Sequence, residues 1–201
     1  MILLVSGATK TVKSFIGNPA IGCLLTPRSG NSISSMDNFL WAADNAAFKN
    51  FDDKKFFLML EKIKDQNPLF VCCPDVWGDS RETLNLFNKW NSIIKGYGLK
   101  SAFVLQDGIK LNEVPFEKID AVFIGGSDKF RAEEEIIKIV KRAKELNKWV
   151  HMGRVNTLKR IRFAHSIGCD SVDGSGFSMF PNTHIPPAVK FINELNSQLA
   201  F

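Results

Sequence analysis

Short apolar runs recur along this chain of 201 residues, and most of them are apolar throughout rather than alternating with polar residues. Strands need this pattern when both faces of a parallel sheet are covered by helices, because neither side of such a strand meets water. We therefore expect strands over eight ranges: Ile2–Ser6, Ile21–Thr26, Phe39–Ala43, Leu69–Cys73, Ala102–Leu105, Ala121–Ile124, Trp149–Met152 and Cys169–Val172.

Segments with helical periodicity separate most of these runs. Asp79 begins an Asp-Ser-Arg-Glu capping box, and Thr157 is an expected N-cap, so each marks the start of a helix. The periodicity predicts helices over five ranges: Lys54–Lys64, Arg81–Ile94, Arg131–Leu146, Leu158–Ile167 and Pro187–Leu199.

Strands that alternate with helices predict an α/β fold, and eight strands predict a compact (β/α)8 TIM-like barrel that forms one domain over residues 1–201. We expect reduced N-terminal helices, with loops such as Pro27–Asp37 in place of the first one or two. An open doubly wound sheet is the alternative. It usually carries a glycine-rich first turn, but Gly7 is not followed by the dinucleotide-binding spacing, so the barrel is favoured.

The composition places broad limits on partners and compartment. Lys and Arg number 26 against 21 Asp and Glu, and the net charge of +5 suits an anionic partner or solubility alone. Four cysteines, Cys23, Cys72, Cys73 and Cys169, form no Cys-x-x-Cys pair and are expected to be reduced core thiols. The first residues lack a basic leader, and no apolar stretch approaches the roughly 20 residues of a membrane span, so we expect a cytoplasmic protein.

Barrel enzymes carry their chemistry at the C-terminal ends of the strands. A single aspartate there is usually a helix cap or turn residue. Asp44, Asp75 and Asp173, however, follow different strands and would face one cavity, where like charges repel unless a substrate or a proton compensates. The candidate site is read from the residues after the later strands: Asp44-Asn45, Pro74-Asp75, Gln106-Asp107-Gly108, Gly125-Gly126-Ser127, Gly153-Arg154 and Asp173-Gly174-Ser175.

These residue types suit a nucleobase better than a phosphate ester. A carboxylate accepts N–H donors from a guanine edge, Gln106 offers both a donor and an acceptor, and glycine admits a flat ring. A remaining carboxylate can attack a sugar carbon, because glycosidic cleavage passes through an oxocarbenium-like state. The chain has no Gly-x-Ser-x-Gly motif, and His151, His165 and His184 form no metal-binding motif, so we expect no metal and no cofactor.

The residues from His151-Met-Gly-Arg to Asp173 resemble the part of the tRNA-guanine transglycosylases that runs from a Met-Gly turn through a helix to the nucleophilic aspartate. Phe103-Val-Leu-Gln-Asp-Gly108 is similar to the Val-Gln-Gly-Gly strand end of that family, and Phe123-Ile-Gly-Gly126 to its next Gly-Gly turn. Trp41-Ala-Ala-Asp-Asn45 and Pro74-Asp-Val-Trp-Gly-Asp79 look more like the short relatives linked to 7-deazaguanine modification of DNA.

The resemblance implies a base-exchanging glycosyltransferase that replaces guanine in a nucleic acid with a free 7-deazaguanine. Asp173 takes the place of the nucleophile, and Asp44 that of an aspartate placed for proton transfer or base contact. The chain lacks the family's zinc-binding cysteine motif, so DNA is favoured over tRNA as the partner and no structural zinc is expected. The expected substrate-binding residues are Asp75, Gln106, Gly125, Gly126, Met152, Gly153 and Arg154, with Arg154 on a backbone phosphate and Trp77 or Phe177 as stacking or rim residues.

Other functions stay open at this point. Gly153-Arg154 and Gly174-Ser175-Gly176 follow the last two strands, where barrel enzymes commonly bind phosphate. The chain could therefore be a small-molecule enzyme or N-glycosidase that acts on a nucleotide or a phosphorylated sugar. A non-catalytic nucleotide-binding protein would use the same pocket.

Overall fold

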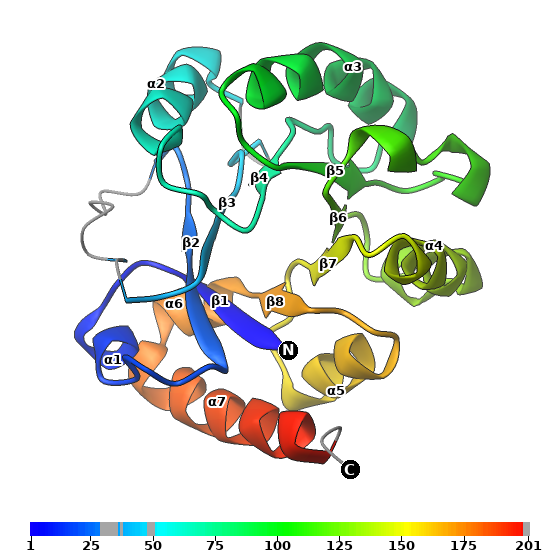
Figure 1. Cartoon of the computed structure of the whole chain (residues 1–201). Coiled ribbons are helices and arrows are strands. Elements are labelled where there is room, and N and C mark those ends of the chain that lie inside the picture. The colour runs from blue at the N-terminus through cyan, green and yellow to red at the C-terminus, as the bar shows by residue number, and fades with distance from the viewer. Residues whose placement is uncertain (29–35, 37, 48–50, 199–201) are drawn as a thin grey trace.

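The computed structural model describes residues 1–28, 36, 38–47 and 51–198. Eight parallel strands close into a barrel in which each strand pairs with its sequence neighbours and β1 pairs with β8 (Figure 1). The predicted α/β fold, a TIM-like (β/α)8 barrel, is confirmed. The strands are β1 (Ile2–Ser6), β2 (Ile21–Leu25), β3 (Trp41–Ala43), β4 (Val71–Cys72), β5 (Ser101–Leu105), β6 (Ala121–Ile124), β7 (Trp149–Met152) and β8 (Ser171–Asp173).

Helices cover the outside of this barrel (Figure 1). The five predicted helices form, and Asp79 and Thr157 cap α3 and α5 through their side chains as expected. The capping box is only half made, because the amide of Asp79 donates to the carbonyl of Val76 (3.1 Å) rather than to Glu82. The helices are α1 (Lys10–Lys13), α2 (Asp53–Ile63), α3 (Ser80–Gly96), α4 (Glu134–Glu145), α5 (Leu158–Ser166), α6 (Ser175–Met179) and α7 (Pro181–Gln198), with 3-10 turns η2 (Leu111–Glu113), η3 (Phe116–Lys118) and η4 (Phe130–Ala132).

The early part of the chain is reduced, as predicted: α1 has four residues, far fewer than α2, α3, α4, α5 or α7. Most of the predicted loop Pro27–Asp37 lies outside the described residues. The sequence reading missed α1 and α6 and began the last helix too late, because the pair Pro186-Pro187 lies inside α7. Proline is disfavoured inside a helix, so the pair suggested a helix start that lies several residues upstream.

Two layers of apolar side chains form the core, and strand alternation separates them. Leu4, Phe70 and Val104 belong to an inner cluster within the barrel. Their strand neighbours Leu3 and Val71 belong to an outer cluster between the strands and the helices. Side chains at every second strand position therefore face the barrel interior. Residues just after a strand that continue this alternation lie at the C-terminal mouth of the barrel.

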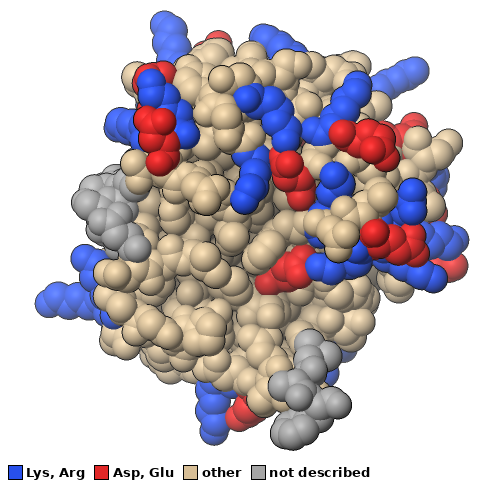
Figure 2. Space-filling model, viewed as in Figure 1, with Lys and Arg blue, Asp and Glu red and all other residues tan. Residues whose placement is uncertain are grey.

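The four cysteines are buried and form no disulfide, as expected. Cys72 belongs to the inner cluster and Cys73 to the outer one. In the view of Figure 2, acidic and basic residues lie intermingled over the upper half of the molecule, so the excess positive charge is not gathered into one basic patch on that face. Within the described part of the chain, no helix combines the length and the apolar character needed to cross a bilayer.

Candidate active site

A cavity of about 520 Å³ lies at the C-terminal mouth of the barrel. Its volume is in the range of pockets that hold a small ligand. The cavity brings together the three predicted carboxylates from β3, β4 and β8, and it includes each of the predicted site residues except Met152. Its lining residues are Ser6, Asp44, Asn45, Ala47, Asp75, Trp77, Val104, Gln106, Phe123, Gly125, Gly126, Gly153, Arg154, Asp173, Ser175, Ser178 and Met179.

The prediction that Met152 lies in this cavity is wrong. Met152 is the last residue of β7, and its buried side chain belongs to the outer core cluster rather than to the barrel interior. Phe177 does not line the cavity either, because it is buried in the core beside the ring of His184. Strand alternation explains the first error: Met152 stands between two inward-facing positions, His151 and Gly153.

A closed network of hydrogen bonds forms the wall of the cavity near β3, β4 and β5. The Asn45 side-chain amide donates to Asp75 Oδ1 (2.8 Å) and to the carbonyl of Cys73 (2.7 Å). The Gln106 side-chain amide donates to Asp75 Oδ2 (2.6 Å), and its carbonyl oxygen accepts from the amide of Gly78 (2.9 Å). Both carboxylate oxygens of Asp75 are therefore held by the protein itself.

The same network fixes the direction of the Asp75 carboxylate and also affects its pKa. Burial raises the pKa of Asp75, while the hydrogen bonds from Asn45 and Gln106 oppose this shift. Each oxygen of a carboxylate can accept two hydrogen bonds, so acceptor capacity remains for a ligand. Asp75 thus presents a rigid acceptor edge to the cavity.

Asp44 follows β3 and lies at the cavity, where the backbone amides of Asn45 and Ala46 hydrogen-bond to its carboxylate. Its Oδ1 accepts from the amide of Asn45 (2.7 Å). Burial raises the pKa of Asp44 to about 7, and the charges of Asp173 and Asp75 add to the rise. Asp44 therefore exchanges a proton near neutral pH, which is what a general acid or base requires.

Asp173 ends β8 and points into the cavity. Its Oδ1 lies 3.0 Å from His151 Nε2, and the side chain keeps 20% of its surface exposed. Asp173 does not cap the following helix, since the N-cap position of α6 is Gly174. Within the part of the chain that the structure describes, Asp173 Oδ2 has no hydrogen-bond partner, so one oxygen of this carboxylate is open to a ligand.

Two glycines form part of the cavity wall between Gln106 and Asp173. A Cβ atom at Gly125 would lie 2.9 Å from Gln106 Nε2 and 3.0 Å from the carbonyl of Leu105. At Gly153 a Cβ atom would lie 2.8 Å from the ring of Phe123 and 3.3 Å from Asp173 Oδ1. Both contacts are too close for a side chain, so glycine at these positions keeps the polar groups and the cavity in place.

The loop after β7 is held by a cation that sequence reasoning missed. The guanidinium of Arg131 is buried, donates to the carbonyl of Gly153 (2.6 Å) and pairs with Asp128. Arg154 follows with a left-handed backbone (φ +60°), and its carbonyl accepts from Arg160 (3.4 Å). This rare conformation for a non-glycine residue fits a functional position at the cavity rim.

Sequence reasoning also missed Asn45 as a partner of Asp75, and His151 as a contact of Asp173. The available signals were weak: Asn45 directly follows Asp44, and His151 lies two residues before Gly153, a position that faces the cavity. No group of three or more His, Cys, Asp or Glu that could hold a metal ion occurs among residues 1–28, 36, 38–47 and 51–198.

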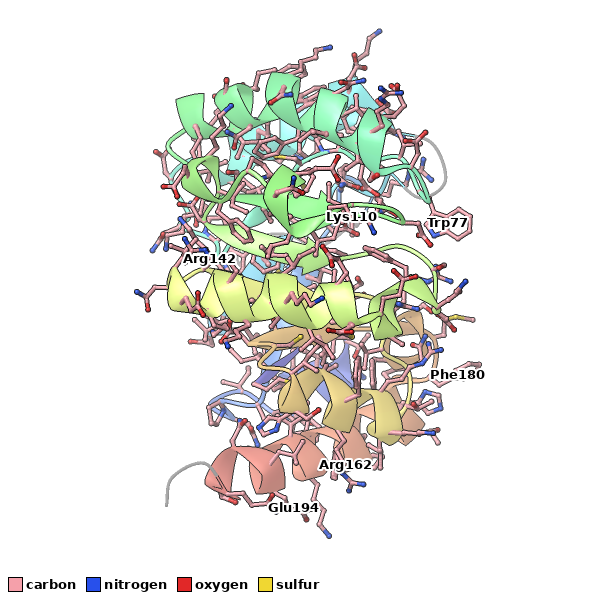
Figure 3. All side chains as sticks on the ribbon, turned by 90° about the vertical axis from the view of Figure 1, so that its right-hand side faces the viewer. Trp77, Lys110, Arg142, Arg162, Phe180 and Glu194 are labelled. Atoms are coloured by element: carbon pink, nitrogen blue, oxygen red, sulfur yellow. The ribbon has the colours of Figure 1, made fainter. Side chains whose placement is uncertain are left out.

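Large apolar side chains surround the mouth of the cavity and are exposed to solvent. Trp77 is 52% exposed, Phe180 is 55% exposed, and Met179 is also exposed. Figure 3 shows Trp77 and Phe180 on the same edge of the barrel, extending beyond the ribbon from two different loops. Exposed aromatic residues beside a polar cavity are typical of a surface that contacts another molecule.

Among known proteins, the chain matches no protein-family model and no curated sequence. The chemistry of the cavity itself is therefore the basis for assigning a function.

Proposed function

We propose that this protein is a base-exchanging glycosyltransferase. It replaces guanine in a nucleic acid, DNA in preference to tRNA, with a free 7-deazaguanine, and the sugar is held on Asp173 between the two steps. The observation that carries this proposal is the difference between three carboxylates in one cavity. Both oxygens of Asp75 are held by hydrogen bonds from the protein, Asp44 has a pKa near neutrality, and Asp173 keeps one open oxygen.

The first step breaks the bond between the sugar and guanine. Asp173 Oδ2 attacks C1′, and the electron pair of the C1′–N9 bond passes to guanine. Asp44 in its acid form gives its proton to the departing base, so guanine leaves as a neutral molecule. A carboxylate suits this step, because it stabilises an oxocarbenium-like state and can then trap the sugar as an ester.

The second step reverses the first with a different base. A 7-deazaguanine enters, and its N9–H proton passes to the Asp44 carboxylate. N9 then attacks C1′, and the C1′–O bond to Asp173 breaks with its electrons returning to the carboxylate. Both aspartates regain their initial states, so the cycle needs no cofactor and no external proton source.

The Asp75 network supports recognition of a guanine-like base. Guanine and 7-deazaguanine share a ring edge with an N1–H and an exocyclic amine, both of which donate hydrogen bonds. The remaining acceptor sites of Asp75 match these donors, and Asn45 and Gln106 hold the carboxylate in position. A site that accepts both donors binds the leaving base and the entering base equally well.

The rim supports a polymer as substrate rather than a free nucleotide. Trp77 and Phe180 present exposed rings on the same edge (Figure 3), and aromatic rings stack on unpaired bases without sequence preference. Arg154 lines the cavity, and in the proposed complex its guanidinium contacts a backbone phosphate. A nucleotide turned out of a helix would enter the cavity while its neighbours contact this rim.

The test uses DNA and tRNA that carry radiolabelled guanine, each incubated with the protein and a 7-deazaguanine. We expect release of labelled guanine and a covalent protein–nucleic acid adduct that survives denaturation. Asp173→Ala abolishes both, whereas Asp65→Asn, an exposed carboxylate remote from the mouth, leaves both unchanged. Undiminished release by Asp173→Ala contradicts the proposal, and so does turnover of a phosphorylated metabolite with no effect on polynucleotide.

A further inference from the structure

We propose that Trp149, Ser171 and His151 form a one-directional hydrogen-bond relay, and that His151 is thereby a positioning residue for Asp173. The relay delivers one N–H to Asp173 Oδ1 and leaves Oδ2 as the reacting oxygen. This role in the reaction rests on the proposed function, but the relay itself is a property of the folded chain.

The four residues meet because β7 and β8 are paired in register. His151 pairs with Ser171 across the two strands, and Trp149 and Asp173 lie two residues away in the same inward-facing set. Trp149 Nε1 lies 2.8 Å from Ser171 Oγ, Ser171 Oγ lies 2.8 Å from His151 Nδ1, and His151 Nε2 lies 3.0 Å from Asp173 Oδ1. The contacts form a continuous chain from the barrel interior to the cavity.

Donor and acceptor chemistry gives this chain a direction. The Trp149 indole can only donate, so Ser171 Oγ accepts from it. Within the described residues, the other hydrogen-bond partner of Ser171 Oγ is His151 Nδ1, so the hydroxyl satisfies its own proton by donating there. Nδ1 then carries no proton, and the ring proton lies on Nε2, where it is donated to Asp173.

Burial makes this arrangement exclusive. Ser171 and His151 have no exposed surface, so bulk water cannot replace either partner. The imidazole packs between two rings, with centroid distances of 4.6 Å to Phe123 and 5.5 Å to Phe70. A buried hydroxyl without an acceptor is costly, so the Ser171 hydroxyl keeps its hydrogen bond to the ring. The contacts with Phe123 and Phe70 fix the plane of the ring. The same contacts fix the carboxylate that the ring holds.

A nucleophile gains from this arrangement because its reactive oxygen is held in one orientation before substrate binds. His151 reaches the substrate only through Asp173, since the ring is fully buried below the carboxylate. Its expected effect is therefore on the rate of ester formation rather than on substrate binding.

The first test needs no substrate. Histidine labelled with ¹⁵N gives three imidazole spin systems in a two-bond ¹H–¹⁵N spectrum, from His151, His165 and His184, and the His151→Gln variant identifies that of His151. We expect a neutral ring with the proton on Nε2. In Ser171→Ala the unprotonated Nδ1 loses its donor, and its resonance moves to higher frequency. A ring protonated on Nδ1, or on both nitrogens, overturns the relay.

Ser101→Ala is the matched control for that shift. Ser101 is also the first residue of its strand and fully buried, but its hydroxyl donates to Asn91 (2.6 Å) and not to the barrel interior. The His151 spectrum therefore stays unchanged in Ser101→Ala. An equal shift in both variants overturns the relay, because it would report a general loosening of the barrel.

The second test separates positioning from proton transfer. Gln in place of His151 can donate to Asp173 and accept from Ser171, but it does not titrate, whereas Phe removes both contacts at similar size. We expect His151→Gln to retain kcat to within about tenfold and His151→Phe to lose roughly 10- to 100-fold in kcat, with KM unchanged in both. Circular dichroism confirms that each variant is folded.

The two tests distinguish the possible failures. An Nε2–H ring in a protein that exchanges no base supports the relay and rejects the proposed function. Base exchange by a protein whose His151 ring carries the proton on Nδ1 supports the proposed function and overturns the relay. Equal losses in His151→Gln and His151→Phe overturn the positioning role, because a titrating imidazole would then be required.

Discussion

The two sides of the cavity hold the same kind of side chain in opposite states. On the side of β4 and β5, both oxygens of Asp75 accept hydrogen bonds from buried amides. On the side of β8, Asp173 has one oxygen held by His151 and the other open to the cavity. In the proposed reaction, Asp75 offers a fixed acceptor edge and Asp173 forms a bond to the sugar. The surroundings of a carboxylate, rather than its residue type, decide its role.

Removal of the charge on each side is the sharpest test of this difference. We expect Asp173→Asn to lower the rate of guanine release by ~10⁴-fold or more, because an amide cannot form the ester. Asp75→Asn leaves the nucleophile intact and acts mainly on KM for the base, since it replaces an acceptor with a donor. Steady-state kinetics on labelled DNA measures both, and equal losses in kcat would erase the distinction between the two sides.

Asp44 lies between the two sides, and its pKa of about 7 predicts a pH dependence. In the proposed reaction the acid form protonates the departing base, so we expect the rate of guanine release in the wild type to fall as the pH rises above about 7. Asp44→Asn lacks this proton and loses ~10²-fold or more at pH 6. We expect the rate of guanine release by Asp44→Asn to stay constant between pH 6 and 8. A decline that persists in this variant would assign the titration to another group.

The same carboxyl also affects stability. Its pKa is higher in the folded protein than the value of 3.8 expected for the unfolded chain, so the folded state binds the proton more tightly. Stability from this group is complete below about pH 4 and is lost as the pH rises toward 7. Relative to wild type, Asp44→Asn therefore gains up to about 4 kcal/mol in unfolding free energy between pH 4 and pH 8. Urea titrations at the two pH values measure the gain, and an equal difference at both would contradict it.

The Asp75 network is expected to be strongly coupled. Loss of one buried partner leaves the other unsatisfied, so Asn45→Ala and Asp75→Ala each destabilise the protein by about 1–3 kcal/mol. The double variant costs less than the sum by about 1–2 kcal/mol. Chemical denaturation measures the cycle. Asp173→Asn is the comparison from the open side, and we expect it to change the unfolding free energy by under about 1 kcal/mol. If the Asn45→Ala and Asp75→Ala losses simply add in the double variant, the amide and the carboxylate act independently.

The glycine wall between the two sides gives the smallest effect. Gly125→Ala puts a methyl group against Gln106 Nε2, and we expect a loss of about 1–2 kcal/mol together with weaker base binding. Gly96→Ala, at the end of α3 where a Cβ atom meets open space, gains up to about 1 kcal/mol. Thermal unfolding compares the two. A neutral Gly125→Ala would mean that the Gln106 side can shift without cost.

Much of the fold followed from local patterns. The apolar runs at Ile2–Ser6, Ala121–Ile124 and Trp149–Met152 match β1, β6 and β7 residue for residue. The helix caps at Asp79 and Thr157 were readable because a cap depends on side chains within four residues. Strand ends at β3, β4 and β8 were less accurate, because the residues that pair there are decided by neighbouring strands.

The sequence by itself determined the alternation of strands and helices, which favoured the barrel, and it placed Asp44, Asp75 and Asp173 after strands, because periodicity and order along the chain are local properties. Closure of the barrel depends on the pairing of β1 with β8, which are far apart in the sequence. The tertiary structure alone decided which carboxylate oxygens are held and which is open. Those contacts join Asn45 to Asp75 and His151 to Asp173, pairs that are far apart along the chain. Inward or outward direction depends on a register of one residue, which is why Met152 was placed wrongly and the contact between His151 and Asp173 was missed.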